Sequence, residues 1–97
     1  MTTPIKINQA ADHVGQDVTL TGWVQKRADK GKLQFISLRD GSGTMQCVVF
    51  KKNLPEEQFD AARHITLESA VSISGNLRAE PRAPGGYELD AAAFEVI

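Results

Sequence analysis

The segment KLQFISLRDGSGTMQCVVF, residues 32–50, has the alternation of two β-strands joined by a tight turn. In the first strand Ile36 and Leu38 share a face and form its expected buried pair. The DGSG tetrapeptide places Asp and Gly where a hairpin turn needs positive φ. The other face of that strand mixes an aromatic ring with polar and charged groups: Leu33, Phe35, Ser37 and Arg39. This mixed face is the first candidate for a binding surface.

The sequence around this hairpin predicts a further strand before it and a helix after it. DVTLTGWVQKR, residues 17–27, alternates as a strand, with Gly22 where a barrel strand bends, and ADKGK, residues 28–32, is expected to be a turn. LPEEQFDAARHI, residues 54–65, has acids at its start and basic groups at its end, as a helix favours.

The two ends of the chain complete the predicted elements. INQAADHVGQ, residues 7–16, suits a short helix that Asn8 caps and Gly15 ends. AVSISGNLRAE, residues 70–80, and YELDAAAFEVI, residues 87–97, are strands separated by a turn rich in Pro and Gly. The apolar parity of the last strand shifts near Ala92, which predicts a β-bulge.

Three strands, a helix and two strands, with glycines inside strands, is the plan of the OB-fold barrel. We therefore predict an all-β fold with short helices: a five-stranded OB-fold barrel, a helix between strands three and four, and a short N-terminal helix. An open α+β sheet is the alternative. With 97 residues, the chain is expected to be a single domain, residues 1–97.

Composition excludes several classes of protein. Hydrophobic residues make up 41% and charged residues 24%, as in ordinary soluble proteins, and no apolar run is long enough to cross a membrane. The N-terminus lacks the apolar core of a signal peptide, so we expect a cytoplasmic protein. One cysteine, Cys47, forms neither an intrachain disulfide nor a metal site and is expected to be a buried hydrophobe.

The charge is unevenly distributed. The formal net charge is −1, but residues 26–52 carry seven basic side chains against Asp29 and Asp40, a balance of +5. A polyanion responds to the nearest charges more than to the total, so Lys26, Arg27 and Lys30 mark a candidate nucleic-acid surface. The alternative is a solvated loop and strand ends.

Two uncharged side chains fit the same surface. OB barrels usually bind ligands on strands two and three and the loops around them, where an outward aromatic such as Phe35 can stack on a base. Gln46, across the hairpin, offers both a donor and an acceptor for a base edge. From periodicity alone, Phe35 could instead pack under a loop, and Gln46 could be a solvated strand residue.

Five segments together resemble the N-terminal anticodon-binding domain of class IIb aminoacyl-tRNA synthetases, which serve aspartate, asparagine and lysine. They are, in this order, HVGQDVTLTGWV, LQFISLRDGSG, MQCVVF, VSISGNL and RAPGGYEL, and the resemblance as a whole covers about residues 5–97. The turn GKLQF and the segment APGGYEL are most similar to the asparaginyl type, and archaeal-type aspartyl enzymes are the nearest rivals.

The resemblance implies a role for particular residues. Phe35 matches the phenylalanine that stacks on the central anticodon uridine, and Gln46 matches the glutamine that hydrogen-bonds it. The family's arginine five residues after the tryptophan falls on Ala28, with Arg27 one residue earlier. The first anticodon base would be recognised near the last two strands, by Arg78 and Glu88.

The implied function is binding of a tRNA anticodon stem-loop, tRNA-Asn first, with no catalysis by this chain. The family's catalytic domain, which uses ATP and magnesium, would act in cis or in trans, and none of its motifs occurs here. The chain itself is expected to hold no cofactor and no metal. The alternatives are the same domain of an aspartyl-type enzyme, or a free-standing OB module that docks on protein or binds single-stranded nucleic acid.

Overall fold

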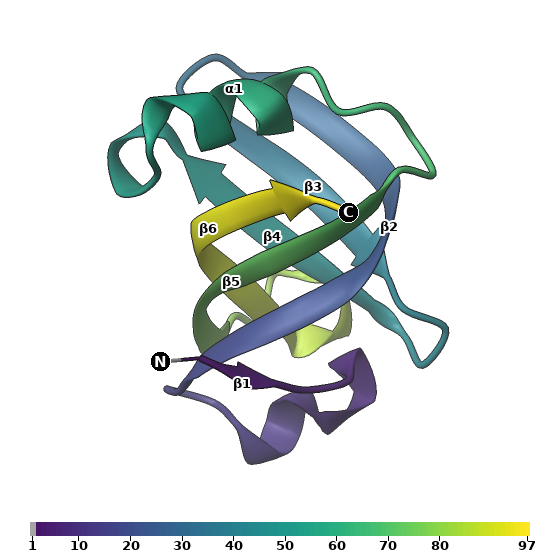
Figure 1. The fold of residues 1–97 in the computed structure, drawn as a ribbon. Helices are drawn as coiled ribbons and strands as arrows, with labels where there is room; N and C mark the ends of the chain where they lie inside the picture. The colour runs from purple at the N-terminus through teal and green to yellow at the C-terminus, as the bar shows by residue number, and fades with distance from the viewer. Residues whose placement is uncertain (1) are drawn as a thin grey trace.

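The predicted alternation is realised as a sheet that closes on itself (Figure 1). The computed structural model describes residues 2–97. Its strand order is β1-β2-β3-β4-β6-β5, and pairing of β2 with β5 closes the barrel. The elements are β1 (Thr3–Pro4), the 3-10 helix η1 (Ile7–Asp12), β2 (Asp17–Lys30), β3 (Leu33–Arg39), β4 (Thr44–Phe50), the 3-10 helix η2 (Lys51–Asn53), α1 (Glu56–Arg63), β5 (Ala70–Ala79), the 3-10 helix η3 (Pro84–Gly86) and β6 (Tyr87–Val96).

The five-stranded OB-fold barrel is confirmed, with β2 to β6 as its strands and α1 between the third and the fourth. Antiparallel pairs join most neighbours, but β4 and β6 run parallel. The two-residue strand β1, which pairs with β2, was not predicted. The turn expected at residues 28–32 is confined to residues 31 and 32, because β2 continues to Lys30 and pairs there with Leu33.

The N-terminal helix forms, but its expected ends are wrong. Lys6 rather than Asn8 is the N-cap, and the helix ends at Asp12 before Gly15. The hairpin turn between β3 and β4 supplies the missing acceptors: the backbone N–H of Ile7 donates to Asp40 Oδ2 at 2.8 Å, and that of Asn8 donates to Ser42 Oγ at 3.1 Å. Asn8 has no need to cap a helix whose first N–H groups are satisfied by another segment.

Two glycines and two bulges give the barrel its curvature. A Cβ at Gly22 would lie 2.3 Å from the carbonyl oxygen of Arg39, and one at Gly75 would lie 2.1 Å from that of Asp90. The pairing of β5 with β6 skips Ala92, so the predicted bulge is confirmed. A second register shift, on β2, leaves Gln25 unpaired between its neighbours.

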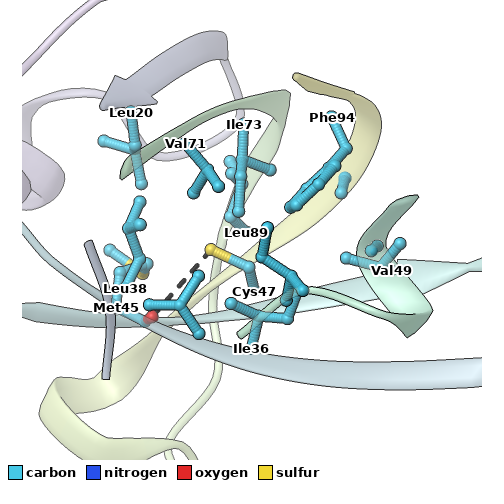
Figure 2. Packing of buried hydrophobic residues seen from close by; sticks show 14 of the residues in the cluster. Leu20, Ile36, Leu38, Met45, Cys47, Val49, Val71, Ile73, Leu89 and Phe94 are labelled. Carbon is cyan, nitrogen blue, oxygen red and sulfur yellow. Dashed lines mark hydrogen bonds between the residues drawn. The ribbon is translucent and has the colours of Figure 1, made fainter. Parts of the chain in front are cut away.

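The inward side chains of all five strands fill the barrel (Figure 2). Ile36 and Leu38 are fully buried, as the alternation predicts. Cys47 is also buried, and burial raises the pKa of its thiol, so it packs as a hydrophobe. Helix α1 covers one end of the barrel with Phe59 and Ala62, and the N-terminal helix lies toward the other end (Figure 1). Within residues 2–97, no helix is long and apolar enough to cross a membrane.

Candidate nucleic-acid interface

The candidate interface lies on the outer face of β2, β3 and β4. Phe35 is half-buried there, and in register it lies between Ala28 on β2 and Val48 on β4. The next row along the strands places Ser37 between Lys26 and Gln46. The prediction that Phe35 and Ile36 point to opposite faces is confirmed.

A hollow of about 400 Å³ opens on this face, within the usual range for ligand sites. Its wall includes the two predicted base-binding side chains, Phe35 and Gln46, together with Lys26 and Ala28. Ala28 is the direct neighbour of Phe35 and has only a methyl group, which leaves room beside the ring. The bulge at Gln25 matters here, because it sets the face on which the next residues of β2 lie.

Gln46 is held by a buried acid. Its Nε2 donates to Glu88 Oε2 at 2.7 Å, and the two residues are register partners on the parallel strands β4 and β6. The other carboxylate oxygen of Glu88 accepts a hydrogen bond from Arg78 Nη2. The side chain of Glu88 is only 7% exposed, whereas that of Arg78 is 48% exposed. The hydrogen bond to Glu88 raises the pKa of Arg78, and the two side chains form a salt bridge.

The lysines lie on the same face. Lys26, Ala28 and Lys30 are alternate residues of β2, and all three are exposed to solvent. Five of the seven predicted site residues therefore lie in two adjacent cross-strand rows. Phe35 belongs to one row, and the next row contains Lys26, Gln46, Glu88 and Arg78. Lys30 extends the same side of β2 toward the β2–β3 turn.

Arg27 is the exception. It pairs in register with the buried Ile36, so it starts from the opposite face to Phe35. Its guanidinium donates to Gln34 Oε1 at 3.4 Å and to the carbonyl oxygen of Arg63 at the end of α1. Arg27 is among the residues that line the hollow, but its guanidinium is engaged at the end of α1, so a contact between Arg27 and nucleic acid stays a prediction.

Sequence reasoning missed the polar cluster that engages Arg27. Gln34 is fully buried, and its Nε2 donates to Asp29 Oδ1 at 2.7 Å and to the carbonyl oxygen of Gly31 at 3.1 Å. The hydrogen bond from Gln34, followed by that from the Gly31 backbone, lowers the pKa of Asp29. The signal was present in the sequence, because alternation places Gln34 on the same face as Ile36.

A closed OB barrel with an outward aromatic, a neighbouring amide and lysines on its ligand face has the features of a nucleic-acid-binding domain. The comparison with known families agrees: the model for the OB-fold nucleic acid binding domain matches residues 18–97. The chain belongs to that family.

Two relatives and one solved structure are similar to the chain over most of its length. The chain is 58% identical over 91 residues to an asparagine–tRNA ligase of Roseiflexus castenholzii, covering 94% of this chain and 21% of the relative. It is 60% identical over 87 residues to one of Chloroflexus aurantiacus, covering 90% and 20%. The crystal structure of asparaginyl-tRNA synthetase from Pyrococcus horikoshii with asparaginyl-adenylate superposes with a TM-score of 0.90 at 36% identity, over 100% of this chain and 23% of that one. The chain thus spans about a fifth of the length of the curated relatives it matches.

Proposed function

We propose that this chain recognises the anticodon loop of tRNA-Asn, as the anticodon-binding domain of an asparagine–tRNA ligase. The observation that carries the proposal is the outward Phe35 beside Gln46 on a hollowed, lysine-edged face. The names of its relatives support the same assignment. A barrel that served only to dock on protein would have no need of this pair of side chains.

Phe35 and Gln46 would make different kinds of contact with the central uridine. The ring of Phe35 offers its face for stacking, which contributes about 1–3 kcal/mol per base and does not depend on the base. Gln46 would accept from the uracil N3–H through Oε1 and donate from Nε2 to a uracil carbonyl. Stacking would therefore supply affinity, and the amide would supply the choice of base.

The remaining predicted contacts surround this centre. Lys26 and Lys30 would meet phosphates on either side of the stacked base, because they lie on the same side of β2 as Ala28. Arg78 and Glu88 would recognise the first anticodon base as a pair, with the more exposed Arg78 making the direct contact. Arg27 would reach the loop only by leaving its contacts at the end of α1.

The chain would perform no chemistry of its own. Aminoacylation would belong to a catalytic domain joined in cis or acting in trans, and ATP and magnesium would bind there. The chain spans only about a fifth of the ligases it resembles, which is consistent with this division of labour. Such a protein would work in the cytoplasm, where tRNA is charged.

A titration tests the proposal. We would measure the affinity of the 97-residue chain for anticodon stem-loops carrying GUU, GUC and UUU, and for a GUU loop whose central uridine is replaced by cytidine. The proposal predicts that GUU binds most tightly and that the cytidine loop binds more weakly. Tightest binding to GUC would assign the aspartyl-type alternative. Equal binding to all four loops would contradict anticodon recognition and leave a general single-strand binder.

A further inference from the structure

Glu88 fixes the direction in which the Gln46 amide points. A carboxylate only accepts hydrogen bonds, so it must face the NH₂ end of the glutamine. The 2.7 Å contact joins Gln46 Nε2 to Glu88 Oε2, and within residues 2–97 Gln46 Oε1 has no hydrogen-bond partner. The amide therefore presents a free carbonyl oxygen and one remaining N–H to the hollow beside Phe35.

Arg78 in turn fixes the carboxylate. Its guanidinium donates to Oε1 of Glu88, the oxygen that Gln46 does not use. Arg78 and Glu88 are also register partners on the antiparallel strands β5 and β6, so backbone pairing sets their positions. Because Glu88 is 5% exposed, little of its carboxylate remains open to a base.

A glutamine that rotated freely would not distinguish the two pyrimidines. In one orientation its oxygen accepts from the N3–H of uracil while its nitrogen donates to a carbonyl. When the amide is rotated by 180° about the Cγ–Cδ bond, its nitrogen donates to N3 of cytosine and its oxygen accepts from the cytosine amino group. The turned orientation would bring Oε1 against the Glu88 carboxylate, and two acceptors repel each other.

We infer that Glu88 is a specificity-determining positioning residue: it holds the Gln46 amide in the orientation that suits uridine and excludes the one that suits cytidine. This inference rests on the proposed function, because it needs Gln46 to contact the base. It differs from recognition of the first anticodon base by Glu88, since here the acid acts on the central base through another side chain.

The isosteric change Glu88→Gln gives the test. Arg78 only donates, so it would draw the carbonyl of the new amide and turn the NH₂ toward Gln46. That NH₂ suits Gln46 in its turned orientation. We would measure the affinities for GUU and for the central-cytidine loop, and also for a loop with its first base changed. Glu68→Gln is the matched control, because Glu68 also forms a salt bridge with an arginine, Arg39, is 65% exposed, and makes no hydrogen bond to Gln46, whose bonded carboxylate is that of Glu88.

The expected result is that the variant no longer prefers uridine to cytidine at the central position of the anticodon. A mismatched polar pair gives the wild type roughly a tenfold preference for uridine; Glu88→Gln should bring that ratio to one or below, and Glu68→Gln should leave it unchanged. A folded Glu88→Gln variant that keeps the uridine preference and loses only the first-base preference would overturn the inference and leave the proposed function standing. A wild type without any uridine preference would overturn both.

A spectroscopic measurement tests, without RNA, whether Glu88 holds the Gln46 amide in one orientation. In the free wild-type chain, the side-chain N–H₂ group of Gln46 should be rigid by ¹⁵N relaxation, and in Glu88→Gln it should change chemical shift, while Glu68→Gln leaves it as it was. This readout also applies if the Glu88 variant folds poorly, because it can be made on the wild type alone. A mobile Gln46 amide in the wild type would overturn the inference.

Discussion

Two clusters of the barrel combine the same three types of side chain with different consequences. On the inner side of β3, Gln34 donates to Asp29 and accepts from Arg27. On the outer side of β4, Gln46 donates to Glu88, and its oxygen has no partner among residues 2–97. Gln34 is fully buried, whereas Gln46 borders an open hollow.

The difference lies in how completely each amide is satisfied. A buried amide with all its groups paired holds the chain together, because losing any partner leaves a desolvated polar group. An amide that is held at its nitrogen and open at its oxygen is already oriented for a ligand at little further entropic cost. The Gln34 cluster is therefore structural, and the Gln46 cluster is arranged for recognition. The following changes test that contrast.

The largest expected effect concerns the core beside both clusters. Ile36→Ala removes a fully buried side chain and should lower the free energy of unfolding by about 2–5 kcal/mol, measured by chemical denaturation. Phe35→Ala, one residue away, serves as the comparison and should lower it much less. Equal losses for the two variants would show that the ring of Phe35 belongs to the core.

Gln34→Ala should destabilise the protein without altering its choice of base. The change removes a fully buried amide and its hydrogen bonds to Asp29, Arg27 and the Gly31 carbonyl, and should cost about 1–3 kcal/mol of unfolding free energy. The ratio of affinities for the uridine and cytidine loops should stay at its wild-type value. A stable Gln34→Ala variant with an altered ratio would reverse the roles assigned to the two clusters.

Phe35→Ala should weaken binding to both loops alike. Loss of one stacking platform costs about 1–3 kcal/mol of binding free energy whichever base is present. Titration of the folded variant against the uridine and cytidine loops would show two parallel decreases. Unchanged affinities would mean that the ring does not touch the base.

Lys30→Glu should have the smallest effect, and the effect should depend on salt. Each phosphate contact with a single strand contributes about 0.7 to the slope of log affinity against log salt concentration. The variant should flatten that slope by about this amount and weaken all stem-loops equally. An affinity that does not change with salt in the wild type would show that the basic segment is only a solvated surface.

Local patterns predicted most of the fold. Alternation placed Ile36 inside and Phe35 outside, and the parity shift near Ala92 located a real bulge. Patterning failed at residues 28–30, where the end of β2 is exposed and shows no apolar alternation to mark a strand. It failed at Asn8 because the acceptors for the helix come from a turn more than thirty residues away.

The sequence predicted individual residues of the candidate site but not the hydrogen bonds that join them. The resemblance identified Phe35 and Gln46 individually. The contact between Gln46 and Glu88 joins residues 42 positions apart through a parallel strand pair, and no local pattern encodes such a pairing. The face of Arg27 was likewise set by the bulge at Gln25, which alternation did not locate.

The central claim is that Gln46 recognises the central base of the anticodon, and Gln46→Ala tests it most directly. We would compare wild type and variant on the uridine and cytidine stem-loops at one fixed salt concentration. The account predicts that the uridine loop loses about 1–3 kcal/mol of binding free energy while the cytidine loop is nearly unchanged, so that the preference disappears. Equal weakening of both loops would contradict recognition of the base by the glutamine.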